Sequence, residues 1–387
     1  MEPEKLRIAL FSGNYNYVRD GANQALNRLV DYLLRQGAAV RIYSPTVEEP
    51  AFKAVGEVVS VPSIAAPGRP EYRLPLRLPI SVRRDMADFA PNVIHVASPD
   101  LVAHRAISWA RRRDIPVVAS VHTRFETYLG YYHLEWLEPS VRALLRRFYR
   151  RCDALVAPAE STAAILRAQR MNRDISIWTR GIDRAQFNPK RRSADFREAH
   201  GFREDEVVVA FLGRLVLEKG LDMFADALDA AAAQLKVLVI GDGPAREWFA
   251  ARLPDAIFAG QLSGSDLAIA LASADVFFNP SITETFGNVT LEAMACGLPV
   301  VAAAASGATS IVRDGKTGTL VEPGAIDEFA AALCAYAAKP ALRAKHGAAG
   351  LAYAKTMDWD SINSVVMKVY SRVIERRRRA KAMGVPI

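Results

Sequence analysis

The stretch Val207–Leu228, with the sequence VVVAFLGRLVLEKGLDMFADAL, joins a short apolar run to a longer amphipathic one. Its first part, Val207–Leu212, is rich in β-branched residues and has the length of a strand that is buried on both faces. Gly213 ends this run, and apolar residues recur at helical spacing from Leu221 onward. A strand that leads directly into a helix predicts a parallel sheet, because neighbouring parallel strands need a crossover between them.

The same alternation extends over the whole chain and starts afresh near its middle. The strand-like runs of the first half are Arg7–Ser12, Ala39–Pro45, Glu57–Pro62, Asn92–Ala97, Pro116–His122, Ala154–Pro158 and Ile175–Trp178. Those of the second half are Val207–Leu212, Lys236–Ile240, Ala256–Ala259, Val276–Asn279, Pro299–Ala303 and Gly318–Val321. Helical patterns separate these runs. The sequence therefore predicts the α/β class, with two doubly wound, Rossmann-like domains built on parallel sheets.

The domain boundary is expected in a polar stretch, residues 183–203, which contains Pro189 and lacks clear periodicity. A length of 387 residues suits two domains. We assign residues 1–185 to an N-terminal domain, residues 186–359 to a C-terminal domain, and residues 360–387 to a last helix with a basic end. Ligands of such sheets bind beyond the carboxyl ends of the strands, so two such domains are expected to face each other across a cleft.

The composition is that of a soluble globular protein, with 51% hydrophobic and 24% charged residues. The sequence contains no apolar run long enough to span a bilayer and no signal-peptide pattern, so we expect a cytoplasmic protein. The three cysteines form no CxxC pair, which argues against a disulfide framework and against a thiolate zinc site.

Positive charge is concentrated in the first half and in the tail. Residues 1–200 hold 31 lysines and arginines against 21 acidic residues, whereas residues 201–387 hold 19 against 21. A basic patch, Arg376–Lys381, contains five of those 19. This polarity predicts an anionic partner such as phospholipid, nucleic acid or an acidic substrate, although a solvated charged face gives the same pattern. We expect no nucleic acid, because no recognised motif for it is present.

The most informative motif is ETFGNVTLE, which begins at Glu284 just after a strand. Gly287 allows a ligand to approach the backbone, and Asn288 suits the N-cap of the next helix, so that the first amides point at an anion. Glu292 lies about 6 Å further along that helix. The two glutamates therefore suit the two ends of an extended ligand such as a nucleotide sugar. On the pair alone, a helix with a solvated and a capping glutamate is an equal alternative.

A second motif lies after the strand that opens this section. Gly213 and Arg214 follow it directly, and Lys219 precedes the next helix. Two cations at the carboxyl end of a sheet suit a diphosphate leaving group, although an ordinary turn with exposed bases fits equally well. The turn Gly241-Asp-Gly-Pro follows the next strand and says little by itself.

Two further features belong to the first half. Of the six histidines, His122, at the end of a strand, is the best placed for chemistry, although such a histidine is often structural. Gly13 and Gly21 lie in the loop after the first strand, where glycine allows close approach to a phosphate or a sugar. The loop lacks a GxGxxG pattern, so a nicotinamide or flavin cofactor is not supported.

Together these motifs resemble those of the family-4 retaining glycosyltransferases of GT-B fold. The resemblance rests on Glu284–Glu292, Gly213–Gly220, Gly241–Pro244, Trp178–Asp183 and His122, and it covers nearly the whole chain. Within the family, Ile94–Pro99, residues 122–128 and Thr283–Gly287 look most like the bacterial lipid glycosyltransferases and the plant sulfolipid synthases.

The resemblance implies a role for each motif. Arg214 and Lys219 would bind the donor diphosphate, Glu284 the donor sugar, and Glu292 the ribose. His122 would lie near the reacting centre, so that His122, Glu284, Arg214 and Lys219 form the predicted catalytic set. The further residues expected at the donor are Gly21, Gly213, Gly241, Gly260, Leu262, Phe286, Gly287, Asn288 and Val289. The last helix would cross back onto the first domain. Many members carry two adjacent glycines where this chain has only Gly21.

The resemblance also implies a retaining, metal-independent hexosyltransferase with no cofactor. Arg214 and Lys219 would replace the divalent metal of other transferases, and the leaving phosphate would take the acceptor proton. The Asp-x-Asp sequence at Asp358–Asp360 precedes the last helix, where aspartate is a natural N-cap, so we do not assign it to a metal.

The acceptor is expected to be a membrane lipid such as diacylglycerol or ceramide. Arginines between Arg142 and Arg151 lie at helical spacing beside Leu144, Leu145, Phe148 and Tyr149, and aromatic residues precede them at 128–136. This arrangement suits attachment to anionic lipid through the basic N-terminal domain and tail, on the inner face of the cytoplasmic membrane. For the donor we favour UDP over GDP as the nucleotide. The alternatives are a buried core face with solvated arginines, a soluble or polysaccharide acceptor, and a non-catalytic nucleotide-sugar binder.

Overall fold

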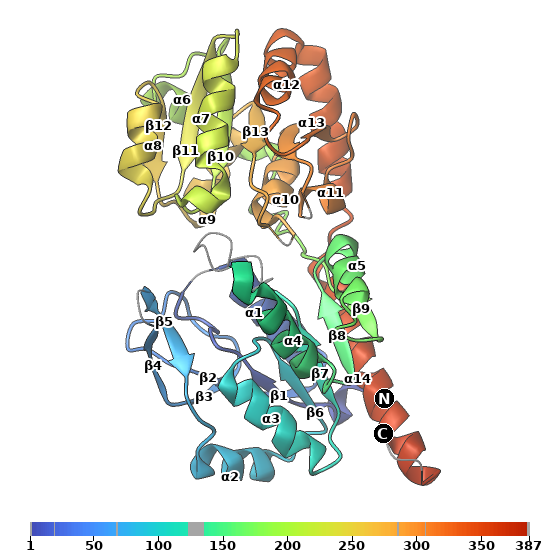
Figure 1. Cartoon of the computed structure of the whole chain (residues 1–387). Coiled ribbons are helices and arrows are strands. Elements are labelled where there is room, and N and C mark those ends of the chain that lie inside the picture. Colours follow the sequence, from blue (N-terminus) through green and yellow to red (C-terminus); the bar gives the residue numbers. More distant parts are fainter. Residues whose placement is uncertain are drawn as a thin grey trace. The chain divides into compact units, whose positions relative to one another are not determined.

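A computed structural model of the chain describes residues 2–18, 20–66, 69–122, 135–284, 286–305 and 307–384. The chain divides into two units, one formed by Met1–Arg180 with Trp359–Ile387 and the other by Gly181–Asp358 (Figure 1). The first break therefore lies five residues before the boundary expected from the sequence. None of the described helices combines the length and the apolar character that a bilayer span needs.

The first unit contains a sheet of seven parallel strands in the order β3-β2-β1-β6-β7-β8-β9. The strands are β1 (Arg7–Phe11), β2 (Ala39–Ser44), β3 (Glu57–Ser60), β6 (Val93–Val96), β7 (Val117–Ser120), β8 (Ala154–Ala157) and β9 (Ile175–Ile177). The chain runs outward from β1 to β3 and then returns to β6 beside β1, so the strand order reverses between β1 and β6. A separate antiparallel hairpin, β4 (Ser63–Ala66) and β5 (Arg69–Pro75), was not expected from the sequence.

Helices cover both faces of this sheet. On one face lie α1 (Gly21–Arg35) and α14 (Trp359–Ala382), whose apolar side chains share a core. On the other face lie α2 (Ile80–Phe89), α3 (Leu101–Arg111), α4 (Glu138–Tyr149) and α5 (Glu160–Ala168). The last helix thus packs within the first unit, where Asn363 of α14 accepts a hydrogen bond from Trp178 Nε1 at 3.0 Å and donates one to the Arg28 carbonyl at 3.1 Å.

The second unit contains a sheet of six parallel strands in the order β12-β11-β10-β13-β14-β15. The strands are β10 (Val207–Leu212), β11 (Leu235–Ile240), β12 (Ile257–Gly260), β13 (Val276–Asn279), β14 (Val300–Ala303) and β15 (Gly318–Val321). The helices are α6 (Ala194–Ala199), α7 (Leu221–Ala230), α8 (Arg246–Arg252), α9 (Gly264–Ala272), α10 (Asn288–Ala295), α11 (Ala308–Ile311), α12 (Ile326–Ala338) and α13 (Pro340–Ala354). Here the order reverses between β10 and β13. The prediction of two Rossmann-like α/β domains is confirmed.

Candidate functional site

The reversal point of the second sheet brings together two loops from distant parts of the sequence. Lys219 lies in the loop after β10, Glu284 in the loop after β13, and these strands are neighbours. Lys219 Nζ is 3.1 Å from Glu284 Oε1, with the lysine side chain 28% and the glutamate side chain 12% exposed. Thr283 Oγ1 also donates to the Glu218 carbonyl at 3.1 Å, which joins the two loops. Ligands of doubly wound sheets bind at such reversal points, so this is the candidate site.

The Glu284 carboxylate is held in place from several sides. Asn279, the last residue of β13, has its Nδ2 3.4 Å from Glu284 Oε2 and 3.1 Å from Thr290 Oγ1. A Cβ at Gly287 would lie 3.0 Å from Glu284 Oε2, and one at Gly307 would lie 2.6 Å from the Glu284 carbonyl oxygen. A larger residue at Gly287 or Gly307 would therefore push against Glu284. The two glycines allow the Glu284 backbone and carboxylate to keep this position.

The start of α10 differs from the expected capping arrangement. Gly287, with φ +93°, occupies the N-cap position, and Asn288 is the first helical residue rather than the cap. Its Oδ1 is buried and has no hydrogen-bond partner in the described part of the chain. The amides of Thr290 and Leu291 donate to the Gly287 carbonyl, whereas no acceptor within the described residues is recorded for the amides of Gly287, Asn288 and Val289. Phe286, just before them, is buried. This end of α10 offers donors to an anion, as expected.

Glu292 lies one turn inside the same helix and is partly buried. Its carboxyl group has no hydrogen-bond or ion-pair partner in the described part of the chain. Burial, and then the nearby charge of Glu284, raise the pKa of Glu292 to about 8. In the absence of a ligand this carboxyl group is therefore mostly protonated at neutral pH. Hydroxyl groups that donate to the carboxylate would favour its ionised form.

The other predicted donor residues lie on the same edge of the sheet. The Gly213 amide donates to the Ile240 carbonyl at 3.0 Å, and the Gly241 amide to the Gly260 carbonyl at 2.8 Å. Gly241 has φ +139°, and a Cβ there would lie 1.9 Å from the Gly213 carbonyl oxygen, so only glycine fits. The predicted residues that lie at or beyond the carboxyl ends of β10, β11, β12 and β13 are Gly213, Arg214, Lys219, Gly241, Gly260, Leu262, Glu284, Phe286, Gly287, Asn288, Val289 and Glu292. Arg214 among them is exposed.

In the first unit His122 belongs to a chain of hydrogen bonds. Arg180 Nη2 lies 3.0 Å from His122 Nδ1, and His122 Nε2 lies 2.8 Å from Ser120 Oγ. Ser120 Oγ is 2.8 Å from His95 Nε2, and His95 Nδ1 is 2.5 Å from the Tyr370 hydroxyl. Arginine can only donate, so His122 Nδ1 accepts and its Nε2–H donates to Ser120. Ser120 then donates to His95, and His95 Nδ1–H donates to Tyr370.

The surroundings of His122 in this series of hydrogen bonds fix its protonation state. Burial, and then the charge of Arg180, hold the pKa of His122 well below its usual range, so the imidazole is neutral. Both of its ring nitrogens are engaged by protein groups. Burial lowers the pKa of Arg180 to about 10, although Asp20 opposes the shift. From the sequence, Arg180 was predicted only as part of the Trp178–Asp183 motif, with no role of its own. Its place just beyond the carboxyl end of β9 was the signal for a functional role.

The loop after β1 lies at the reversal point of the first sheet, where the Gly13 amide donates to Ser98 Oγ at 3.0 Å. Gly21 is the first residue of α1, but a carboxylate already occupies the end of that helix. Asp20 Oδ1 accepts from the amides of Ala22 at 2.9 Å and Asn23 at 2.8 Å. Among the first-turn amides of α1 only that of Gly21 is then left for a phosphate, so the predicted role of Gly21 stays a prediction.

The prediction that the apolar residues of α4 form a membrane-binding face is wrong in part. Leu145, Phe148 and Tyr149 are buried in the core of the first unit, so the core reading of these residues holds. Their side chains face the sheet because α4 covers it, and the same spacing of apolar residues serves a core-facing helix. Leu144 and Trp136 remain 59% and 73% exposed. Residues 123–134, which contain most of the aromatic segment, lie outside the described residues.

The basic tail is largely paired within the molecule. Arg376 contacts Asp174, Arg377 contacts Asp153, and Arg379 contacts Glu375. Only Arg378 and Lys381 of the patch lack a hydrogen bond or short ion pair to another described residue. The Asp-x-Asp sequence is similarly engaged at one end, since Asp360 pairs with Arg35 at 2.6 Å.

Two family descriptions match the chain. "Glycosyltransferase Family 4" matches residues 19–186, and "Glycosyl transferases group 1" matches residues 206–339. Among solved structures, the sucrose-phosphate synthase from Thermosynechococcus elongatus superposes with a TM-score of 0.79 at 21% identity. The match covers 96% of this chain and 100% of that one, and it supports the fold.

Three curated relatives extend the similarity. The sulfoquinovosyl transferase SQD2 of Arabidopsis thaliana is 32% identical over 85% of this chain and 67% of its own length. The GDP-mannose-dependent alpha-mannosyltransferase of Mycolicibacterium smegmatis is 31% identical over 96% of this chain and 99% of its own. The alpha-monoglucosyldiacylglycerol synthase of Streptococcus pneumoniae is 26% identical over 81% of this chain and 75% of its own.

Proposed function

Because the chain belongs to the family-4 glycosyltransferases of GT-B fold, we propose that it transfers a hexosyl group from a nucleoside diphosphate sugar to a membrane lipid. The transfer proceeds with retention of configuration and without a metal ion. The observation that carries the donor assignment is the cluster at the reversal point of the second sheet, where Lys219 and Glu284 meet beside the start of α10.

The groups of this cluster match the parts of a nucleotide sugar. The amides of Asn288 and Val289 and the cations Arg214 and Lys219 suit the diphosphate, because they can balance the negative charge that develops on it. The Glu284 carboxylate, which is held by Asn279, suits hydroxyls of the sugar. The carboxyl group of Glu292, which lacks a partner in the described part of the chain, suits the two hydroxyls of the ribose.

The proposed reaction occurs on one face of the sugar. The bond from C1 to the leaving phosphate oxygen breaks, the acceptor oxygen bonds to C1 on the same face, and the acceptor proton passes to the leaving phosphate. Arg214 and Lys219 stabilise the departing diphosphate electrostatically. His122 supplies an uncharged ring near the reacting centre and does not act as a base, since Arg180 and Ser120 engage its two nitrogens.

We propose UDP as the nucleotide, with GDP as the second candidate because a relative of similar length is described as GDP-mannose-dependent. The test is a thermal-shift panel of UDP, GDP, ADP and their common sugars, with and without EDTA. The true donor should raise the melting temperature, because a ligand that binds only the folded state stabilises it. A shift that EDTA abolishes would contradict the metal-independent mechanism, and no shift with any nucleotide would contradict the donor assignment.

A lipid acceptor is supported by the charge and shape of the first unit. This unit carries 33 lysines and arginines against 20 acidic residues, a net charge of +13, whereas the second unit has 17 against 22, a net charge of −5. A hollow of about 830 Å³ between α2 and α3 is lined by five arginines together with Leu78, Ile80 and Trp109. Ile80 is 66% exposed. An exposed isoleucine among arginines suits an anionic lipid surface, whereas Leu78 and Trp109 are buried beneath it.

We therefore place the enzyme on the inner face of the cytoplasmic membrane. The test is flotation of the full chain with phosphatidylcholine vesicles that contain or lack phosphatidylglycerol. Binding should require the acidic lipid and should weaken as salt is added. Equal recovery in the soluble fraction with both vesicles, together with transfer to a soluble sugar acceptor, would instead support the soluble-acceptor alternative.

A further inference from the structure

The first unit contains a second basic cavity, of about 1050 Å³, at the opposite edge of its sheet from His122. Its walls come from the end of α3, the segment between α4 and β8, the segment between α5 and β9, and α14. These segments lie at the amino ends of β7, β8 and β9, whereas His122 lies beyond the carboxyl end of β7. A ligand in this cavity would therefore be remote from the reacting groups of the same unit.

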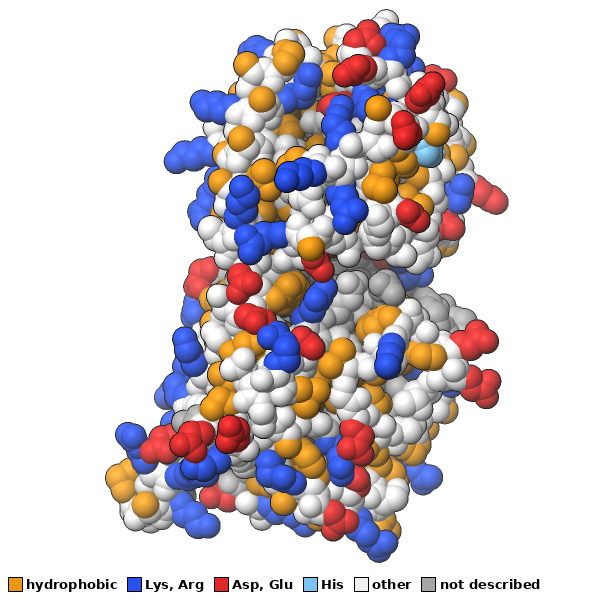
Figure 2. All heavy atoms as spheres, turned by 180° about the vertical axis from the view of Figure 1, so that it is seen from behind, with side chains coloured by type: hydrophobic (Ala, Val, Ile, Leu, Met, Phe, Trp, Pro, Cys, Tyr) orange, Lys and Arg blue, Asp and Glu red, His pale blue; other side chains and the backbone are white. Residues whose placement is uncertain are grey.

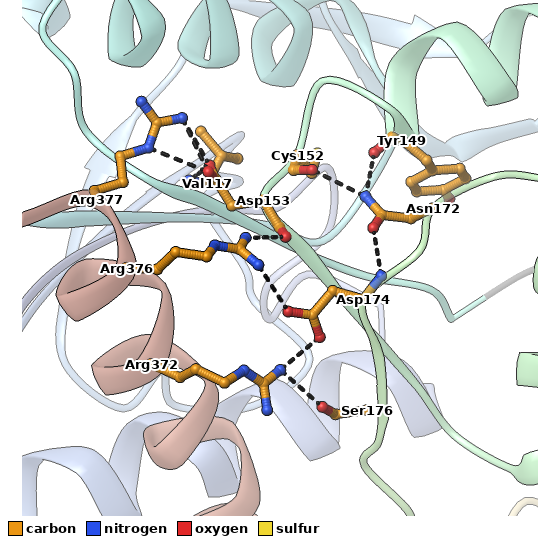
Figure 3. Close-up of polar contacts among 10 residues, drawn as sticks. All are labelled: Val117, Tyr149, Cys152, Asp153, Asn172, Asp174, Ser176, Arg372, Arg376 and Arg377. Carbon is orange, nitrogen blue, oxygen red and sulfur yellow. Dashed lines mark hydrogen bonds and ion pairs between the residues drawn. The ribbon is translucent and has the colours of Figure 1, made fainter. Parts of the chain in front are cut away.

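The cavity has far more positive than negative charge. Eight of its twelve lining residues are arginines and two are aspartates. Both aspartates are engaged by α14, as Figure 3 shows. Arg377 Nη2 lies 2.9 Å from Asp153 Oδ1, and Arg372 Nη2 lies 2.6 Å from Asp174 Oδ1. They are thus not available to neutralise the arginines on the other walls.

Three of those arginines, Arg111, Arg170 and Arg173, have no side-chain hydrogen bond or ion pair within the described residues. Within the described residues Arg150 uses only its Nε, which donates to the Arg170 carbonyl at 3.0 Å. The crowding affects a neighbour, since burial and then the charge of Arg111 lower the pKa of Arg151. Arginine does not lose its proton in proteins, so this excess charge can be balanced only by solvent ions or by a bound anion.

The floor of the cavity is held in one shape. Asn172 Nδ2 donates to the carbonyls of Tyr149 and Cys152, both at 2.9 Å, and its Oδ1 accepts from the Asp174 amide at 2.9 Å (Figure 3). One side chain therefore ties the segment before β8 to the segment before β9. The guanidinium groups are arranged around a preformed hollow, which lowers the entropy lost on binding.

One face of the molecule offers a contrast. On the face drawn in Figure 2, Lys and Arg side chains are interspersed with Asp and Glu side chains on both units. Such mixed surfaces bind anions weakly, because neighbouring charges of opposite sign cancel. The cavity differs from that face, because arginines outnumber aspartates among its described lining residues and both aspartates are already paired.

We propose that this cavity binds a phosphate-bearing anion, either free polyphosphate or the clustered headgroups of acidic lipids. Phosphate oxygens accept paired hydrogen bonds from guanidinium groups, and several arginines can share one such ligand. The bound anion connects α14 to the ends of α3 and α5. It acts as an effector or an anchor, and it stabilises the first unit without touching the reacting groups.

The test is calorimetric titration of the full chain with sodium triphosphate at constant ionic strength, in the presence of saturating UDP so that the candidate donor site is occupied. Arg111→Gln/Arg173→Gln removes two arginines that make no recorded internal contact, so folding should not suffer. We expect affinity to fall roughly tenfold for each removed guanidinium. Lys316→Gln/Lys345→Gln, which removes two exposed lysines of the second unit, is the charge-matched control and should bind as the wild type does.

A parallel flotation assay uses vesicles with and without phosphatidylglycerol. A loss confined to triphosphate identifies a free anion as the ligand, and a loss confined to the vesicles identifies a lipid headgroup. The proposal is overturned if the arginine variant equals the lysine control in both assays. UDP binding by the variant is measured separately, so a failure of the donor assignment is not confused with a failure of this site.

Discussion

Nη2 of Arg180 lies 3.0 Å from Nδ1 of His122, and this contact orders a buried chain of hydrogen bonds that ends at Tyr370 of α14. Because a guanidinium can only donate, the direction of the first hydrogen bond is known, and it determines the direction of each bond that follows. The contact thus defines the tautomer of His122, and it connects the predicted site of the first unit to the last helix of the chain.

We expect Arg180→Gln to lower kcat for sugar transfer by about ten- to a hundredfold, the range of one to two hydrogen-bond free energies at 1.4 kcal/mol per decade. The donor KM should change little, since Arg180 acts through His122. The imidazole of His122 should also titrate at higher pH, because a nearby positive charge is removed. Nitrogen-15 NMR of the histidines reads both tautomer and pKa. An unchanged His122 spectrum in an inactive variant would refute the positioning role.

Tyr370→Phe should destabilise the first unit by about 1–3 kcal/mol, because it leaves the His95 Nδ1–H buried without an acceptor. Urea unfolding measures the change. Tyr353→Phe is a suitable control, since no hydrogen bond of that hydroxyl is recorded within the described residues, and its unfolding midpoint should match that of the wild type.

Donor binding should strengthen as pH rises from 6 to 8, because the Glu292 carboxyl group, with a pKa of about 8, ionises increasingly over this range. The ribose hydroxyls favour the ionised carboxylate, so binding releases a proton. Calorimetry in buffers of different ionisation enthalpy counts that proton, and Glu292→Gln should release none. Proton release that is identical in wild type and variant would exclude Glu292 as its source.

The same group has the opposite effect on the stability of the ligand-free protein. Its pKa is raised from 4.5, so between about pH 4.5 and 8 the folded state binds more protons than the unfolded state. The free energy of unfolding should therefore fall as pH rises through this window, and Glu292→Gln should flatten the fall. Urea unfolding at several pH values provides the comparison. A variant with the wild-type slope would assign the dependence to other groups.

Gly287→Ala should weaken donor binding more than it weakens the fold. The substitution strains a backbone at φ +93°, by about 1–2 kcal/mol, and places a methyl group 3.0 Å from Glu284 Oε2. Gly315→Ala is the matched control, since Gly315 has φ +65° and a Cβ there meets nothing within 4 Å. Thermal shift with the donor separates the two effects. Equal loss of donor binding in both variants would mean that the contact with Glu284 is irrelevant.

Arg377→Gln should destabilise the chain by about 3–5 kcal/mol, because it leaves Asp153 as a buried charge without its partner. The side chains of this pair are 10% and 5% exposed. Arg379→Gln on the same helix breaks an exposed pair with Glu375 and should change stability by less than about 1 kcal/mol. Denaturant unfolding of both variants measures the difference. Similar small losses would show that the buried pair is not important for holding α14.

The position of the predicted donor-side residues at the carboxyl edge of the sheet could be read from the sequence, because each lies at or beyond the end of a strand that has a clear apolar pattern. Lys219 and Glu284 could both be placed at the carboxyl edge in this way. Their direct contact could not be predicted, because it depends on β13 lying beside β10 rather than at the far edge of the sheet. The Asn288 cap was wrong because Gly287 takes the cap with a backbone conformation that sequence spacing does not reveal.

The interior of the first unit was harder to predict. The chain from Arg180 to Tyr370 joins residues from four separate segments, and nothing local marks His95 or Tyr370 as its members. The helix α4 shows a different limit. Arginines beside apolar residues at helical spacing fit both a membrane surface and a core-facing helix, and only packing separates them. The Pro-containing strand β5 and the Ala- and Gly-rich helix α13 gave no usable periodicity.

The placement of α14 has a consequence for how the chain is made. Its residues Val366, Val369, Tyr370 and Val373 belong to the same core as α1 and β1, yet they leave the ribosome only after the whole second unit. The second unit is complete in sequence before they emerge, so it can fold while one face of the earlier sheet is still uncovered. The apolar surface of the nascent first unit therefore stays exposed until α14 has emerged. Chaperone binding during translation is expected at that surface.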